Sequence, residues 1–259
     1  MHTDNKTKLT WVGVLRLVVG GIFRLISIVA LLAVLGISYL LFQNAKQTKE
    51  TQDLNVQLVE MRQEVETEED NTDWSKGMLD INSDYKGWLT IYGTQISEPV
   101  VQGETNETYL RTNINKEHAE AGTLFLDETT DLTQDGNLII YGHKMNDGTM
   151  FGTLDKYQDQ TLFEQHPEFY IYLPGKILKY RIFSCYAGRT GSEGYRYHFP
   201  EAEDFQIFLD TVSSYGDYDT GTELSATDRI VTLSTCVNSR RNYRYLVHGK
   251  LSSEIITEE

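Results

Sequence analysis

The sequence has 259 residues, enough for one good-sized domain with additional segments. Its formal net charge of −15 argues against nucleic acid as a partner. Two cysteines, Cys185 and Cys236, are too few for a disulfide scaffold, although spacing alone leaves a bond between them open, and sixteen tyrosines and ten phenylalanines supply ample core material.

A long apolar stretch lies near the N-terminus. Leu25 to Phe42 is almost wholly apolar, and its 18 residues in a helix span about 27 Å, close to the hydrocarbon thickness of a bilayer. A cleaved signal peptide is the competing interpretation, but the run is longer than the apolar part of such a peptide, and no small-x-small cleavage site follows Phe42. We therefore expect a transmembrane signal anchor over residues 25–45.

The charges around this stretch predict its orientation. The first 24 residues carry one acid, Asp4, and four basic residues, namely Lys6, Lys8, Arg16 and Arg24. Because basic flanks remain on the cytoplasmic side, we expect residues 1–24 in the cytoplasm and the bulk of the chain outside the cell membrane. The bilayer, contacted through one helix, is then a partner of this protein.

Residues 46–73 are polar and contain neither Gly nor Pro. Leu54, Leu58, Met61 and Val65 recur at spacings of four, three and four, which is one stripe of a helix. This pattern predicts a helical stalk or a helix packed on the flank of the following domain, and a solvated, partly helical linker fits the same composition.

From about residue 74 the sequence changes to short apolar runs separated by turn residues. Many short strands favour a mainly β fold, a barrel or sandwich, over parallel βαβ units. The predicted strands are Gly87 to Tyr92, Glu98 to Val101, Gly122 to Leu126, Asn137 to Tyr141, Glu168 to Leu173, Leu178 to Ala187, Arg229 to Thr235 and Tyr245 to Leu251.

Helical patterns are few in this part of the chain. Glu107 to Arg111 predicts a short helix, and Phe151 to Tyr157 predicts about two turns. Ala202 to Tyr215 places Phe205, Phe208, Leu209 and Val212 on one face, so we expect an amphipathic helix that covers part of the sheet.

Two reactive side chains stand at predicted strand ends. Cys236 closes the β-branched run Arg229 to Thr235, and His143 follows Gly142 after the strand Asn137 to Tyr141. A strand end presents a side chain at a fixed place, so the two form a candidate Cys/His pair. Cys236 as a small packed hydrophobe is the alternative. The other histidines (His2, His118, His166, His198 and His248) lie in loops, in the cytoplasmic segment or inside a strand pattern, and are expected to be inert or structural.

Such a pair predicts nucleophilic catalysis. A thiolate attacks, an imidazole protonates the departing amine, and an arginine with a backbone N–H stabilises the oxyanion. No Cys-x-x-Cys, His-x-x-x-His or glycine-rich phosphate loop occurs, so we expect neither a metal nor another cofactor.

Three motifs together resemble the sortases, the cysteine transpeptidases of Gram-positive cell surfaces. Thr232 to Cys236 (TLSTC) matches their TLxTC signature, Tyr141 to Phe151 resembles their catalytic-histidine segment, and Arg244 to Lys250 resembles the strand with their essential arginine. The stretch GHKMNDGTMFGTLDKY, the helix from Ala202 to Tyr215 and the N-terminal helical segment are similar to class B. The resemblance covers residues 74–259 and implies an extracellular catalytic domain with an eight-stranded β-barrel.

The resemblance also implies roles for individual residues. His143, Cys236 and Arg244 become the catalytic residues. Asn106, Leu110, Tyr195 and Ser234 become substrate-binding residues. Arg240 and Arg241 lie in the polar turn VNSRRN, where solvated side chains are expected, and Cys185 is expected to be a hydrophobe inside a strand.

The reaction implied is cleavage of a C-terminal sorting signal after Thr, through a thioacyl intermediate on Cys236, followed by transfer to an amine of the peptidoglycan. The implied partners are surface proteins or pilins that bear the signal. Three alternatives stay open: a pilus-polymerising sortase that uses a pilin lysine as acceptor, a cysteine peptidase that uses water, and a non-catalytic surface-binding domain, for which Cys236 would be dispensable.

Overall fold

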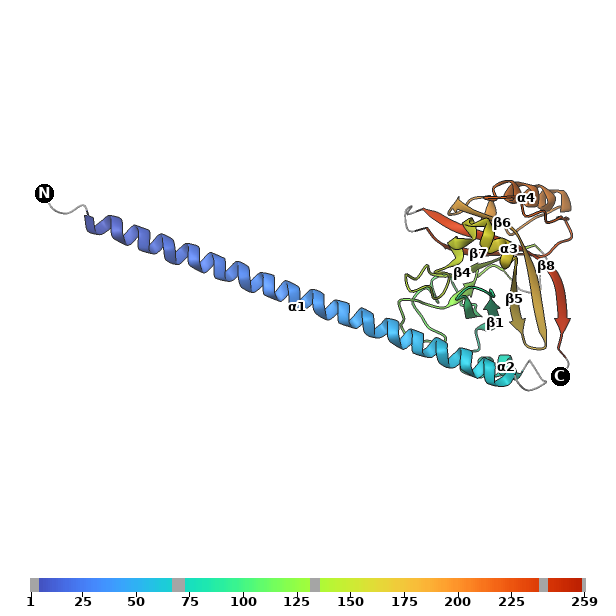
Figure 1. The fold of residues 1–259 in the computed structure, drawn as a ribbon, viewed down its shortest axis with the longest axis horizontal. Coiled ribbons are helices and arrows are strands. Elements are labelled where there is room, and N and C mark those ends of the chain that lie inside the picture. Colours follow the sequence, from blue (N-terminus) through green and yellow to red (C-terminus); the bar gives the residue numbers. More distant parts are fainter. Residues whose placement is uncertain (1–4, 67–72, 131–135, 238–241, 258–259) are drawn as a thin grey trace. The chain divides into compact units, whose positions relative to one another are not determined.

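The computed structural model describes residues 5–66, 73–130, 136–237 and 242–257. The chain divides into two compact units, Met1–Lys49 and Glu50–Glu259, which are described separately (Figure 1).

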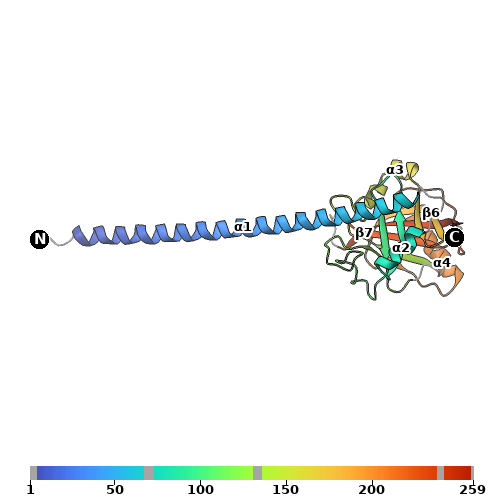
Figure 2. The same cartoon turned by 90° about the horizontal axis from the view of Figure 1, so that it is seen from below.

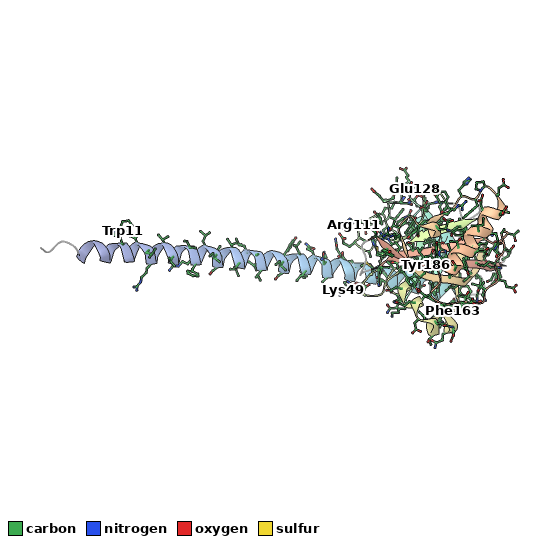
Figure 3. All side chains as sticks on the ribbon, turned by 90° about the horizontal axis from the view of Figure 1, so that it is seen from above. Trp11, Lys49, Arg111, Glu128, Phe163 and Tyr186 are labelled. Carbon is green, nitrogen blue, oxygen red and sulfur yellow. The ribbon has the colours of Figure 1, made fainter. Side chains whose placement is uncertain are left out.

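The N-terminal unit is helical. Helix α1 (Asn5–Glu66) contains Val14–Gln47, the one stretch among the described helices that is long and apolar enough to cross a membrane. Its large apolar side chains are exposed, and Figure 3 shows side chains projecting above and below the helix. The apolar stretch therefore begins earlier than the predicted Leu25. The predicted boundaries of the cytoplasmic, membrane and stalk segments stay predictions.

The last turns of α1 belong to the second unit. Leu54, the described member of the predicted apolar stripe, is half-buried against a cluster that includes Met78 and Trp88. Helix α2 (Asp73–Ile81) carries Met78 and lies beside β1 (Figure 2). Burial of Leu54 against this cluster contributes free energy to the contact, and the choice between a packed helix and a stalk stays a prediction.

The second unit is a closed barrel with strand order β1-β2-β3-β4-β7-β8-β6-β5, and β5 pairs with β1 to close it. All eight predicted strands are present, β4 and β5 with the predicted bounds, and the predicted barrel is confirmed. The strands are β1 (Tyr85–Thr90), β2 (Ser97–Val101), β3 (Leu124–Leu126), β4 (Asn137–Tyr141), β5 (Glu168–Leu173), β6 (Lys176–Arg189), β7 (Ile230–Cys236) and β8 (Tyr243–Ile256).

Alternation along the strands separates the barrel interior from two outer layers. Leu138, Ile140, Val231 and Leu233 belong to the largest buried cluster, whereas their neighbours point to the outer face. One outer cluster lies under α4 (Ala202–Ser214) and includes Phe208. The other lies around α2. Burying these layers supplies the hydrophobic free energy that holds the barrel together.

The helices were predicted less completely. Helix α4 follows the predicted range, and the helical segment predicted from Phe151 to Tyr157 overlaps the 3-10 helix η1 (Leu154–Gln158). Helix α3 (Gln160–Gln165) and the 3-10 helix η2 (Glu193–Tyr195) were not expected.

The predicted helix from Glu107 to Arg111 is wrong: this segment forms turns. The Thr108 hydroxyl accepts the Thr105 N–H, and the Asn106 N–H donates to a Glu128 carboxylate oxygen. These bonds offer the backbone an alternative to helical hydrogen bonds, and one turn is too short to offset the cost of helix nucleation.

Candidate active site

The ends of β7 and β8 bring Cys236 and Arg244 together. The two strands are antiparallel, and Cys236 is the direct partner of Arg244 in the ladder. Both side chains are half-buried on the outer face of the barrel. A slip of one residue would turn both side chains to the interior, so the buried Val231 and Leu233 on the inner face fix the register that presents them.

His143 follows β4, the parallel neighbour of β7. The Gly142 N–H donates to the Ser234 carbonyl over 3.1 Å, so the backbone stays attached to β7 up to the residue before the histidine. A Cβ on Gly142 would lie 2.4 Å from Leu124 Cδ2 and 2.6 Å from Phe151 Cδ2, so a larger residue here would have to displace these two side chains. His143 is therefore presented by a segment that is hydrogen-bonded to β7 and packed against two core side chains.

A backbone carbonyl orients the imidazole of His143. Its Nε2 lies 2.8 Å from the Leu110 carbonyl oxygen. A carbonyl can only accept, so Nε2 carries the proton in this bond and Nδ1 is the nitrogen left for proton exchange. The turn that replaces the predicted helix thus supplies the acceptor that sets the tautomer of His143.

A cavity of about 470 Å³ lies over these strand ends. Its walls include all seven predicted site residues, namely Asn106, Leu110, His143, Tyr195, Ser234, Cys236 and Arg244. Residues from four separated parts of the sequence therefore meet at one concave surface, with a thiol, an imidazole and a guanidinium along it.

Asp127 is a lining residue that the sequence reasoning missed. Its Oδ2 accepts hydrogen bonds from Asn106 Nδ2 and from the Tyr141 hydroxyl, each 3.0 Å long. Burial works against its ionisation, but the bonds from Thr129, Tyr141 and Asn106 outweigh burial and hold the pKa of Asp127 below its usual value. The sequence did contain a signal for this residue, because Asp127 is a carboxylate that directly follows the strand Leu124–Leu126.

Tyr195 and Ser234 form a hydrogen-bonded pair in the wall of the cavity. Their hydroxyl oxygens lie 2.8 Å apart, and the Tyr195 ring stacks on Tyr141 with 6.3 Å between centroids. Burial raises the pKa of Tyr195 to about 12, so its hydroxyl stays protonated at neutral pH.

The other residues singled out in the sequence, where the structure describes them, do not line the cavity. Cys185 is buried in the barrel interior, and burial raises the pKa of its thiol. His118 and His198 are exposed, and His248 is buried. Arg240 and Arg241 lie outside the described residues. Within the described ranges, no group of three or more His, Cys, Asp and Glu side chains is arranged to hold a metal ion.

A buried carboxyl holds the loop that follows His143. Glu98 on β2 is 3% exposed, and its Oε1 accepts the Met150 N–H over 3.2 Å. Met150 has a φ of 53°, and the next N–H, of Phe151, donates to the His143 carbonyl over 3.0 Å. Burial, with a contribution from the charge of Asp147, raises the pKa of Glu98 to about 8 against the Met150 N–H.

This carboxyl predicts a pH-dependent stability. In the unfolded chain Glu98 has its ordinary pKa of 4.5, so between pH 4.5 and about 8 the folded chain holds one proton more. Stability therefore falls as pH rises through this window, by at most about 1.4 kcal/mol per pH unit. Glu98→Gln keeps an acceptor for Met150 and should remove this slope. Urea midpoints at pH 6 and pH 8 measure it, with exposed Glu104→Gln as control; equal slopes in Glu98→Gln and wild type would contradict the prediction.

Comparisons with known proteins agree with this geometry. A family model described as the sortase domain matches residues 89–252. Sortase B of Listeria monocytogenes is 38% identical over 175 residues, which are 66% of this chain and 71% of that protein. Sortase B of Staphylococcus aureus is 35% identical over 176 residues, again 66% and 71%. Among solved structures, the Staphylococcus aureus sortase B-substrate complex aligns with a TM-score of 0.72 at 29% identity, covering 83% of this chain and 100% of that one.

Proposed function

This chain belongs to the sortase family as a class B member, a cysteine transpeptidase, and we propose that it cleaves a C-terminal sorting signal after Thr and transfers the protein to an amine of the peptidoglycan. The observation that carries the proposal is the pairing of Cys236 with Arg244 in a cavity that His143 also lines. Nucleophile, proton carrier and oxyanion stabiliser then lie along one surface.

The first half of the reaction forms a thioester on Cys236. The Cys236 thiolate attacks the carbonyl carbon of the Thr residue, and the negative charge passes to the carbonyl oxygen. The C–N bond then breaks, and the leaving amine takes a proton from Nδ1 of the His143 imidazolium. The bond from His143 Nε2 to the Leu110 carbonyl is kept throughout, which holds the ring in place.

The second half transfers the acyl group. An amine attacks the thioester carbon, His143 Nδ1 accepts its proton, and the C–S bond breaks to return the Cys236 thiolate. Arg244 stabilises the oxyanion in both halves because its strand places it directly beside Cys236. Asn106, Leu110, Tyr195 and Ser234 contact the signal peptide in this proposal.

The same proposal places the catalytic domain outside the cell membrane. The apolar segment Val14–Gln47 then anchors the chain, with the basic residues before it in the cytoplasm. The catalytic domain would then lie on the outer side of the membrane. The sorting signals of exported proteins and the amines of the peptidoglycan are found on the same side.

The test uses the full chain in detergent micelles with a library of peptides that each contain one Thr. We expect an acyl adduct on Cys236 by mass spectrometry and a transfer product with triglycine. Transfer to a lysine peptide in place of triglycine would favour a pilin acceptor, and release of free acid alone would favour a peptidase. A chain that forms no adduct with any peptide would contradict the proposal.

Arg244 offers a graded prediction. Arg244→Ala should lower kcat/KM by roughly a hundredfold or more, because the oxyanion loses a charged donor. Arg244→Lys keeps the charge without the planar fork, so we expect about a tenfold loss. Arg189→Ala is the matched control, since Arg189 lies at the neighbouring strand end with its guanidinium on Tyr243. Steady-state peptide transfer measures all three, and equal rates in Arg244→Ala and Arg189→Ala would remove the role of Arg244.

A further inference from the structure

A line of hydrogen bonds between buried side chains crosses the sheet below the cavity. It begins on β8 at His248, whose Nδ1 lies 2.8 Å from the Thr232 hydroxyl on β7. It continues from that hydroxyl to Asn137 Oδ1 on β4 over 2.6 Å. All three residues are at most 2% exposed. Each belongs to one of the three strands that carry the candidate catalytic residues or lead to them.

The direction of these bonds follows from the donors available. Asn137 Nδ2 donates to the carbonyl oxygens of Gly194 over 3.2 Å and Arg196 over 3.0 Å, so its two hydrogens are used. Asn137 Oδ1 accepts the single hydrogen of Thr232. The Thr232 hydroxyl must then accept from His248, which places the His248 proton on Nδ1. Only this arrangement satisfies every bond in the line.

His248 is suited to a fixed donor role. Burial lowers its pKa to about 3, so the ring is neutral at physiological pH and keeps one proton. Its ring stacks on Tyr186, with 5.4 Å between centroids and 17° between planes, and Tyr186 lies within the barrel unit in Figure 3. Packing and burial thus fix both the position and the tautomer of the first donor.

At its Asn137 end, the line of hydrogen bonds fixes the backbone around Tyr195. Gly194 and Arg196, whose carbonyls accept from Asn137, are the residues immediately before and after it. The segment lies tightly on the sheet, because a Cβ on Gly194 would be 2.5 Å from the Tyr186 hydroxyl and 2.8 Å from Leu246 Cδ1. With its backbone held on both sides, Tyr195 directs its hydroxyl to Ser234 in the cavity wall.

We propose that Asn137 is a positioning residue for substrate binding: its amide fixes the backbone on both sides of Tyr195, and Thr232 and His248 fix the orientation of that amide. The inference rests on the proposed function, in which Tyr195 contacts the signal peptide. The proposal is that Asn137, Thr232 and His248 affect peptide affinity although they are buried. They do so by fixing the position of Tyr195.

The first test exchanges the central hydroxyl. Thr232→Val keeps the shape of the side chain and removes the hydroxyl, whereas Thr232→Ser keeps the hydroxyl. With the full chain in detergent micelles and the library peptide that wild type turns over best, KM should rise roughly three- to tenfold in Thr232→Val, with kcat within about twofold. Thr232→Ser should restore the wild-type KM. Alkylation of Cys236 by iodoacetamide should proceed equally in both variants, because the nucleophile itself is unchanged.

The second test asks whether the effect passes through Tyr195. In a double-mutant cycle, Thr232→Val should raise KM in wild type but leave it within about twofold in a Tyr195→Ala background. If the Thr232 hydroxyl only stabilised the fold, Thr232→Val would change KM by the same factor in both backgrounds. Asn137→Asp, which loses at least one of the two hydrogen bonds to these carbonyls, should behave like Thr232→Val in the same cycle.

The outcomes separate this inference from the proposed function. If wild type transfers peptide to triglycine and Thr232→Val equals Thr232→Ser in KM, or the cycle is additive, the positioning role is wrong and the enzyme assignment stands. If wild type forms no acyl adduct at all, the proposed function fails first. The inference is supported if Thr232→Val raises KM in wild type and has no such effect on KM in the Tyr195→Ala background.

Discussion

Cys236→Ala should abolish peptide transfer, with a loss of about a thousandfold or more in kcat/KM. The variant has no sulfur to form the thioester, and neither water nor a neighbouring side chain at this strand end replaces a covalent nucleophile. The half-buried position of Cys236 means that truncation leaves little empty space, so the fold should persist. Transfer of the library peptides to triglycine, together with intact-mass detection of the acyl adduct, measures the effect.

The chain provides its own matched control in Cys185. This thiol lies on β6 opposite Val247 of β8 and is 1% exposed inside the barrel, and burial raises its pKa, so it is a poor nucleophile. Cys185→Ala should retain transfer activity and lower thermal stability by an amount typical of a small cavity, about 1 kcal/mol. If Cys185→Ala and Cys236→Ala lost activity to the same extent, the assignment of the nucleophile would be wrong.

Most of the barrel could be predicted because its strands follow local patterns. β7 is a run of β-branched and apolar residues that ends on Cys236, and β4 has the same character before His143. Parallel pairing of these two strands then places their ends side by side, which is why strand-end reasoning found the candidate pair. The sortase resemblance added Arg244, whose register opposite Cys236 the structure shows.

The missed features depend on contacts that no local pattern encodes. Asn137 is the first residue of a strand in the sequence, yet its amide partners are 57 and 59 residues away. Asp127 binds Asn106 and Tyr141, which are 21 and 14 residues away. The helix predicted from Glu107 to Arg111 was wrong in part because Asn106, the residue before it, is hydrogen-bonded to the distant Glu128. Hydrogen bonds between residues far apart in the sequence thus determine the conformation of the loops around the cavity.

The remaining large effect is expected at His143, and its size should depend on the leaving group. His143→Gln should lower the rate of Cys236 acylation by an amide substrate by roughly a thousandfold, since an amine leaves only when it is protonated. An activated ester releases a phenolate that needs no proton. With a 4-nitrophenyl ester of the same peptide we therefore expect the loss in acylation rate to shrink to about tenfold. The glutamine amide can still donate to the Leu110 carbonyl, so the turn opposite should keep its place.

Single-turnover acylation of Cys236 with the amide and the ester, followed by mass spectrometry, separates these cases. His118→Gln is the matched control, because His118 is exposed and its pairing with Glu120 on the surface contributes little. An equal loss for amide and ester would assign His143 to forming the thiolate rather than to protonating the leaving amine. A large loss for the amide alone makes Nδ1 the proton donor, as the bond from Nε2 to Leu110 requires.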